Sequence, residues 1–319
     1  MKIAAIMMTM DRSPRHNYLA SSIASMIASG MCDDSRVSFS LFHSGKGRSN
    51  LDIELIQRSC ATLHEQSQLD HFNLGIAKAL RLAAEQNADY VLFFEDDVHV
   101  AHDFPDFVCS QLALEPTAVF LDFATYFQEV ETAYLRGERF VELNAAHFYG
   151  TQCFCMPTQH AISFSDNISK NQSQRAGFAD TWIQYWLADN ALDDQIMSSV
   201  PSAVQHVGRD SNHSHSFIRV PAFKDEIERL KPLRTNQYAM CQTVSNGFFL
   251  NNGDIENPLH LNFTAQLIYL YCDGDNSIAD IENAIRSHVY GDRYQLNQQI
   301  RQCLATLIEH SAIRYVTQA

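Results

Sequence analysis

The chain has 319 residues, of which 46% are hydrophobic and 19% are charged, and its net charge is −14. Residues 1–235 contain 19 basic and 29 acidic side chains, and the remainder contains 4 and 8, so both parts are acidic. Such a chain is a poor non-specific binder of nucleic acid. No apolar run approaches the roughly 18 residues of a membrane span. The eight cysteines are scattered, as is typical of a reducing compartment, so we predict a cytoplasmic protein.

Strands and helices alternate along the first two thirds of the sequence. Residues 3–10 form an apolar run typical of a buried strand, and apolar side chains follow at helical spacing between Tyr18 and Ile27. Further strands are predicted at 36–45, 90–94, 118–123 and 151–157, and further helices at 71–87 and 179–190. This alternation predicts an α/β layer fold with a largely parallel sheet.

The most informative stretch is "DYVLFFEDDVHV", residues 89–100, in which an apolar strand ends in Glu95, Asp96 and Asp97. In open α/β sheets, ligands bind beyond the carboxyl ends of the strands. Three adjacent carboxylates repel one another unless a cation or hydrogen-bond donors offset the repulsion. Mn²⁺ or Mg²⁺ is the simplest compensation, and it could also neutralise a diphosphate. The alternative is a solvated strand end whose acids cap a nearby helix.

This carboxylate triplet resembles the DxD-type motif of glycosyltransferases with the GT-A fold. A second stretch, "VPSAVQHVGRDSNH" at 200–213, looks like the P-S-x-x-Q-H-V-G-x-x-S signature of the N-acetylglucosaminyltransferase IV family. The opening "TMDRSPRHNYLASSIASM" also looks like the first loop and helix of that family. The resemblance implies a Rossmann-like GT-A domain that binds a sugar nucleotide, expected to be a UDP-sugar carrying GlcNAc or another hexose.

The resemblance also implies roles for individual residues. Asp97 would be the direct ligand of Mn²⁺ or Mg²⁺, and His206 would be a second protein contact near the metal and the diphosphate. His213 and His215 are nearby substitutes for His206, or solvated loop residues. The implied donor-binding residues are Glu95 and Asp96, which would hold ribose, sugar hydroxyls or metal-bound water, and Thr9 and Arg12, which would meet the nucleotide and its phosphates.

A transferase of inverting type needs a base that takes a proton from the acceptor. In many inverting GT-A enzymes this base is an acid at a helix start, and "GFADTWIQYW" offers Asp180. Aspartate is also a good N-cap, so both roles stay open for Asp180. Asp122 in "FLDF" is the second candidate for the base. The aromatic residues that follow Asp180 could stack on a sugar, but core packing is the favoured interpretation: Trp182, Tyr185 and Trp186.

The last part of the chain predicts a separate domain. Residues 223–237 are charged and lack a clear core face, so we place the domains at 1–225 and 238–319 with a linker at 226–237. Helices are predicted at 277–290 and 296–312. The stretch "LNFTAQLIYLYCDGDNSIADI" resembles the PqqD-like pattern L-N-x-T-A…C-D-G…T-x-x-E-I, with Ser277 in place of the usual threonine. Without this resemblance, the tail would be only a helical dimerisation or winged-helix module.

PqqD-like domains are small winged-helix-like α+β folds that bind the leader segment of a ribosomally made precursor peptide as an added strand. The predicted function is therefore metal-dependent glycosylation of a precursor-peptide side chain, with the leader tethered by the tail. Two alternatives stay open. One is a non-catalytic peptide-binding partner with a degenerate transferase fold, and the other is a metal-dependent nucleotidyltransferase.

Overall fold

The computed structural model describes residues 1–10, 17–46, 51–59, 61–67, 71–172, 175, 177–192, 196–208, 220, 222–242, 248–252, 258–289 and 293–316. The chain forms two compact units: the first contains residues 1–130 and 140–223, and the second contains residues 131–139 and 224–319. Among the described residues, no helix is long and apolar enough to cross a membrane.

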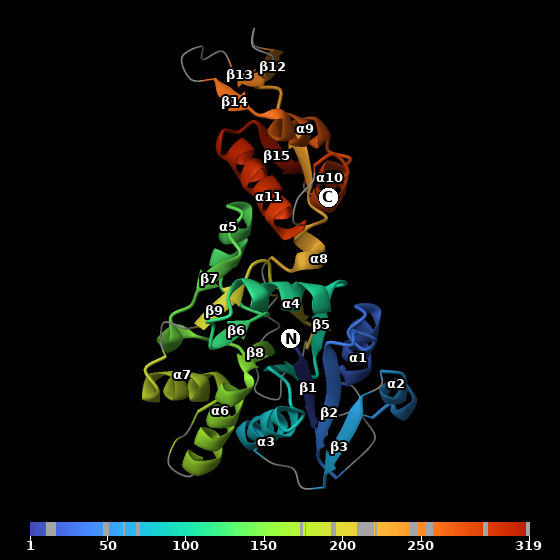
Figure 1. The fold of residues 1–319 in the computed structure, drawn as a ribbon, viewed down its shortest axis with the longest axis vertical. Helices are drawn as coiled ribbons and strands as arrows, with labels where there is room; N and C mark the ends of the chain where they lie inside the picture. The colour runs from blue at the N-terminus through green and yellow to red at the C-terminus, as the bar shows by residue number, and fades with distance from the viewer. Residues whose placement is uncertain are drawn as a thin grey trace. The chain divides into compact units, whose positions relative to one another are not determined.

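The first unit is built on a sheet that has, within the described residues, the strand order β3-β2-β1-β4-β8-β6-β9-β7 (Figure 1). These strands are β1 (Ile3–Met10), β2 (Val37–Ser44), β3 (Thr62–Gln66), β4 (Tyr90–Glu95), β6 (Phe120–Asp122), β7 (Phe140–Glu142), β8 (Cys153–Pro157) and β9 (Ile196–Ser199). Neighbours from β3 to β4 are parallel, β8 is antiparallel to β4 and β6, and β7 is antiparallel to β9. The predicted α/β fold with a largely parallel sheet is confirmed.

Helices cover both faces of this sheet, which explains why the central strands are apolar throughout. One face is covered by α1 (Leu19–Ala28), α2 (Ile53–Arg58) and α4 (Phe104–Leu114), and the other by α3 (Phe72–Ala84), α6 (Thr158–Asn171) and α7 (Ala179–Asp189) (Figure 1). Alternate residues of β1 enter different cores: Ile3 and Met7 pack with the first group, and Ala4 and Met8 with the second.

A short antiparallel ribbon joins two segments that are distant in the sequence. Its strands are β5 (Val98–Val100) and β10 (Val204–His206), and their register pairs His206 with Val98. Because β5 follows directly after the carboxylate triplet, this pairing brings the second motif back to the carboxyl end of β4. The ribbon therefore unites the two stretches that carry the resemblance.

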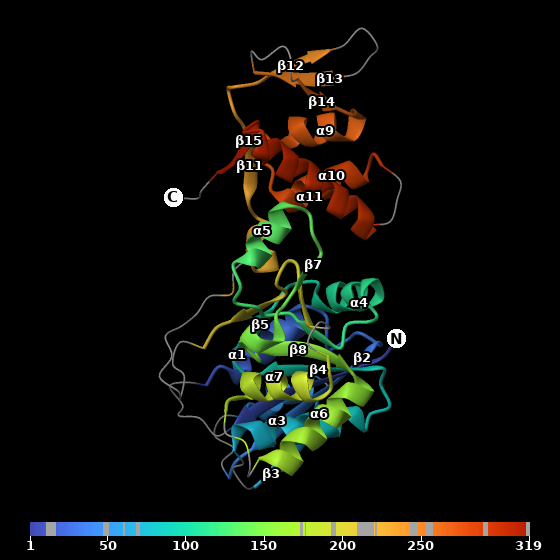
Figure 2. The same ribbon diagram turned by 90° about the vertical axis from the view of Figure 1, so that its left-hand side faces the viewer.

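The second unit contains two small antiparallel sheets and several helices (Figure 2). One sheet has the order β12-β13-β14 and the other pairs β11 with β15: β11 (Lys231–Arg234), β12 (Ala239–Gln242), β13 (Phe248–Asn251), β14 (Leu259–Leu261) and β15 (Ile313–Val316). The helices are α5 (Glu129–Leu135, of which residues 131–135 belong to this unit), α8 (Lys224–Ile227), α9 (Phe263–Tyr271), α10 (Ile278–Arg286) and α11 (Arg293–Glu309). The predicted helices at 277–290 and 296–312 correspond to α10 and α11.

The prediction of a linker at 226–237 is wrong, because this segment is part of the second unit. β11 pairs along its whole length with β15, and the Arg234 amide donates to the carbonyl of Cys272 over 2.9 Å. Two of the charges that suggested a solvated linker, Lys224 and Glu228, are buried in an ion pair. Glu228 is 6% exposed and contacts Lys224 at 2.9 Å and Arg301 at 3.0 Å. Sequence composition could not reveal this, because Arg301 lies far along the chain.

Residues 131–139 are an excursion from the first unit into the second. Tyr134 is 1% exposed, and its ring lies 4.8 Å from the guanidinium carbon of Arg301. Arg301 also donates to Glu282 over 2.7 Å. At Gly137, where φ is +69°, a side chain would stand 2.9 Å from the backbone nitrogen of Gln302. The packing of the second unit therefore includes a piece of chain that the predicted boundaries assigned to the catalytic domain.

Candidate active site

Two of the three carboxylates at the end of β4 are held by threonine hydroxyls. The Thr151 hydroxyl donates to Glu95 Oε1 over 2.6 Å, and the Thr9 hydroxyl donates to Asp96 Oδ2 over 2.6 Å. Asp96 is only 2% exposed. Hydrogen bonds to the ionised form offset the repulsion between neighbouring carboxylates. The structure therefore compensates part of the charge with neutral donors from β1 and from the loop before β8.

Serines of α1 fix the turn that carries Asp96 and Asp97. The Ser22 hydroxyl donates to the Asp96 carbonyl over 2.8 Å and accepts from the Val98 amide over 3.1 Å. The Ser25 hydroxyl accepts from the Val100 amide over 3.3 Å. Neither serine was predicted to belong to the site. The available signal was two serines three positions apart on the inward side of a helix, where they lie on one face.

Asp97 and His206 form the second part of the site. Asp97 Oδ2 lies 3.3 Å from His206 Nε2, and the Val207 amide donates to the Asp97 carbonyl over 2.8 Å. Gly208 leaves the space beside this pair clear: a methyl group there would collide with Asp97 Oδ2 and would stand 2.9 Å from His206 Nε2. The β5–β10 ribbon thus places a carboxylate oxygen and an imidazole nitrogen side by side.

The pair fits one side of a divalent metal site. Among the described residues, no group of three or more His, Cys, Asp or Glu side chains is arranged to hold a metal. Mg²⁺ is usually bound through one or two carboxylates, with substrate phosphates and water completing its shell, and Mn²⁺ accepts similar ligands. Asp97 and His206 would be the protein ligands of such an ion.

The predicted nucleotide contacts have different outcomes. Thr9 is 1% exposed, and its hydroxyl is committed to Asp96, so its visible role is to position that carboxylate. A direct contact of Thr9 with the nucleotide stays a prediction. Arg12, His213 and His215 lie outside the described residues.

Asp180 lies in the first turn of α7 but is not its N-cap, which is Phe178, so the interpretation of Asp180 as an N-cap is wrong. The Thr181 amide donates to Asp180 Oδ1 over 2.7 Å. The start of α7 is held against α3, because the side-chain amide of Asn73 donates to the Gly177 carbonyl over 2.8 Å. A carboxylate in the first turn is favoured by the helix dipole. Asp180 is therefore held in place while it stays partly exposed.

Asp122 is a poor candidate for the base because it is buried. It is 3% exposed, and burial raises its pKa to about 7, although the Ala124 amide donates to Oδ1 over 3.0 Å. Core packing is confirmed for Trp182 and Trp186, each of which is 1% exposed. Tyr185 is 38% exposed. The guanidinium carbon of Arg175 lies over the Tyr185 ring, 5.0 Å from the ring centroid.

Sequence reasoning missed the loop that precedes β8. Thr151 of this loop binds Glu95, and its neighbour Tyr149 is 43% exposed. Burial raises the pKa of Tyr149, and the charges of Asp180 and Glu95 raise it further. The side-chain amide of Gln184 donates to the Phe148 carbonyl over 2.8 Å, so the loop connects Glu95 with the helix that carries Asp180.

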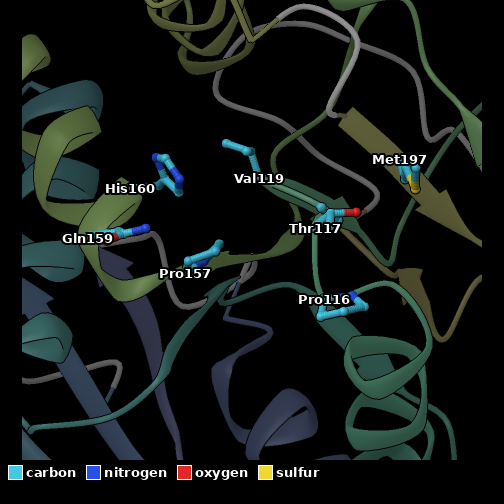
Figure 3. A pocket seen from close by; sticks show the side chains of 8 residues that line it. Pro116, Thr117, Val119, Pro157, Gln159, His160 and Met197 are labelled. Carbon is cyan, nitrogen blue, oxygen red and sulfur yellow. The ribbon is translucent and has the colours of Figure 1, made fainter.

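A cavity of about 570 Å³ lies at the opposite end of the strands from the carboxylates (Figure 3). Its lining residues precede β6, end β8, or lie on α6 or β9: Pro116, Thr117, Ala118, Val119, Pro157, Gln159, His160 and Met197. Pro157 pairs with Tyr90, at the amino end of β4, whereas the carboxylates follow its carboxyl end. This cavity is therefore separate from the candidate active site.

No protein-family model matches the chain, and no curated protein matches it either. Solved structures do. S. aureus TarS has a TM-score of 0.43 and 12% identity, over 64% of this chain and 36% of TarS. The TarS fragment 1–349 in complex with UDP-GlcNAc has a TM-score of 0.45 and 11% identity, over 68% of this chain and 62% of the fragment.

Two further structures come from other proteins. The glycosyltransferase GlyE of Streptococcus pneumoniae has a TM-score of 0.36 and 14% identity, over 62% of this chain and 45% of GlyE. The 4-diphosphocytidyl-2C-methyl-D-erythritol synthase of Anaerococcus prevotii has a TM-score of 0.41 and 9% identity, over 63% of this chain and 90% of the synthase. This chain spans less than two thirds of the TarS and GlyE structures. At these values the likeness carries no functional argument.

Proposed function

We propose that this chain is a metal-dependent glycosyltransferase with a GT-A-type catalytic domain. The observation that carries the proposal is the meeting of the two motifs: β4 delivers Glu95, Asp96 and Asp97, and the β5–β10 ribbon returns His206 to 3.3 Å from Asp97. A carboxylate cluster at the carboxyl end of a parallel strand is where α/β folds bind nucleotides. The donor would be a UDP-sugar carrying GlcNAc or another hexose.

Each side chain has a distinct part in this proposal. Asp97 and His206 would hold Mn²⁺ or Mg²⁺, which when bound would stabilise the negative charge of the leaving diphosphate. Glu95 and Asp96 would accept hydrogen bonds from hydroxyls of the sugar nucleotide, and their threonine donors hold them in place. Asp180 would take the proton from the acceptor hydroxyl as its oxygen attacks the anomeric carbon, which describes an inverting transfer.

We also propose that the second unit binds the leader of a ribosomally made precursor peptide. Three antiparallel strands, β12 to β14, are followed by α9, α10 and α11, an order that supports the PqqD-like resemblance. Ser277 caps α10 in a capping box with Asp280, so the departure from threonine keeps the cap. Within the part of the chain that the structure describes, neither β12 nor β14 pairs with a further strand, and such an edge strand can accept an extended peptide as an added strand.

The "CDG" signature of the tail has a structural explanation. Cys272 is fully buried, and Gly274 adopts φ +86°, a conformation that favours glycine. The carboxylate of Asp273 accepts from the amides of Asp275 and Asn276, over 2.9 and 3.0 Å, which closes the turn. These residues therefore shape the connection between α9 and α10, and leader contacts are expected elsewhere.

Catalysis is tested by incubating the purified chain with UDP-sugars and Mn²⁺ and measuring the release of UDP. Asp97→Ala should abolish release, and chelator should do the same to the wild type until metal is restored. Asp166→Asn, on the exposed side of α6, is the matched carboxylate control and should retain activity. Full activity in chelator would refute metal dependence. Release of pyrophosphate with a nucleotide-bearing product would instead identify a nucleotidyltransferase.

Peptide recognition is tested on the full chain by co-expression with a precursor peptide encoded next to it, followed by intact mass. A gain of one hexose or N-acetylhexosamine is expected. Hydrogen exchange with the leader alone should then show protection along one edge of the β12-β13-β14 sheet. Unmodified peptide together with unchanged exchange would refute leader binding. Protection without a mass change in an enzyme that releases no UDP would identify a non-catalytic peptide-binding partner.

A further inference from the structure

Two tyrosines stand together beside the carboxylates. The rings of Tyr126 and Tyr149 have centroids 5.9 Å apart at an interplanar angle of 52°. Gly150 packs against the Tyr126 ring: a side chain at this position would stand 3.1 Å from Tyr126 Cε2, and φ at Gly150 is +109°. A side chain here would therefore be strained and crowded. Because Gly150 has no side chain, the loop packs directly on Tyr126, and Tyr149 lies next to Tyr126.

This pair, which we call the tyrosine pair, faces both parts of the candidate site. The ring of Tyr126 meets that of His206 edge-on, with centroids 6.5 Å apart. On the other side, Thr151 follows the loop glycine and donates to Glu95. Burial raises the pKa of Tyr126, and the charges of Glu95 and Asp97 add to this effect, so its phenol stays neutral among the carboxylates.

The exposure of Tyr149 separates it from the two tryptophans of α7. Trp182 and Trp186 are core residues, whereas Tyr149 is 43% exposed. An aromatic ring that is open to solvent and flanked by carboxylates matches the chemistry of a pyranose. The C–H groups of the sugar pack on the ring, and its hydroxyls bind the carboxylates.

We propose, resting on the glycosyltransferase function above, that the tyrosine pair is the wall of the donor-sugar subsite. Tyr149 packs on the sugar ring, and Tyr126 holds Tyr149 in position through their ring contact. The sugar is then bounded by the tyrosine pair and by Glu95, with Asp180 nearby. Tyr149 is a specificity-determining residue in this arrangement, because the orientation of each hexose hydroxyl decides which face of the sugar can lie on the ring.

The test compares the affinity of UDP with that of UDP-sugars by titration calorimetry, in the presence of Mn²⁺. UDP-glucose, UDP-galactose and UDP-GlcNAc are measured on the wild-type chain, and the tightest is taken forward. Tyr149→Ala and Tyr149→Leu should each lower the affinity for that UDP-sugar about tenfold and leave the affinity for UDP unchanged. Tyr149→Phe keeps the ring and should stay close to wild type. Tyr185→Ala removes another partly exposed tyrosine and should change neither affinity.

The outcomes separate the inference from the function on which it rests. If the wild-type chain binds no UDP, the proposed function fails, and the inference fails with it. If UDP binds but the Tyr149 variants lose UDP and UDP-sugar affinity equally, the ring contacts the nucleotide and the inference is overturned. Unchanged UDP-sugar affinity in both Tyr149→Ala and Tyr149→Leu overturns it as well. A shifted preference among the three sugars in Tyr149→Leu would support the specificity role.

Discussion

Asp122→Asn replaces a buried carboxyl group with a neutral side chain of nearly the same shape. Asp122 is 3% exposed, and burial raises its pKa from 3.8 to about 7 against the hydrogen bonds from Ala124 and Thr125. The native state therefore holds this proton more tightly than the unfolded state does. As the pH rises through the window between about 4 and 7, the contribution of Asp122 to stability is progressively lost.

The size of the effect follows from the pKa difference. The gap between 3.8 and about 7 corresponds to about 4 kcal/mol at alkaline pH, because each pKa unit is worth about 1.4 kcal/mol. About 3 kcal/mol of this loss should develop between roughly pH 5 and pH 8.5. The Asn variant cannot ionise, so its free energy of unfolding should rise relative to the wild type by this amount over the same range.

Urea unfolding at several pH values measures this difference. Fluorescence of Trp182 and Trp186 is a suitable probe, since both indoles are buried in the core of the first unit. All other titrating groups are common to both proteins and cancel in the comparison. A stability difference that stays constant across this pH range would show that Asp122 titrates normally in the folded protein. That result would contradict the burial of the Asp122 carboxyl group, which is the reason for rejecting Asp122 as the base.

Two further predictions concern the base and the buried ion pairs. Asp180→Asn should lower the rate of transfer by roughly two to four powers of ten with unchanged UDP-sugar affinity; normal turnover would refute the assignment of the base. Arg301→Met removes the cation that contacts Glu228 and Glu282 at 3.0 and 2.7 Å, and should cost about 3–5 kcal/mol of unfolding free energy, because the buried Glu282 loses its cation and the buried Glu228 retains only Lys224. Urea unfolding measures the loss of stability. Adding Glu282→Gln to Arg301→Met should partly restore the stability, and a loss below about 1 kcal/mol in Arg301→Met would contradict the predicted role of the network.

Local sequence patterns predicted the elements whose own residues carry the signal. The apolar run of β1, the helical spacing in α3 and the carboxylates at the end of β4 needed no knowledge of their neighbours. Strand β3 was missed, because its residues are polar and only partly buried at the edge of the sheet. Helix α6 was missed because Ser, Asn and Thr obscure its buried stripe, which includes Phe164 and Ile168.

The partners in the site could not be predicted, because they are set by tertiary register. The hydroxyl partners of Glu95 and Asp96 lie 56 and 87 residues away in the sequence. Antiparallel β8 places Thr151 beside Glu95, and nothing in the local sequence signals that strand's direction. His206 was anticipated near the metal only through the resemblance of its motif. The register of β5 and β10 then explains physically why it lies beside Asp97.

The division of the chain also changes how peptide recognition can be separated from catalysis. A deletion of residues 238–319 would remove β15, the partner of β11, and would also remove Arg301, which lies over the ring of Tyr134. Tyr134 is 1% exposed, so the truncated chain would present a large aromatic surface that the whole chain buries. Lost activity in such a truncation would then report misfolding as readily as lost leader binding. Point substitutions along the edge strands β12 and β14, in the full chain, avoid this ambiguity because they leave the Arg301 network and β11 in place.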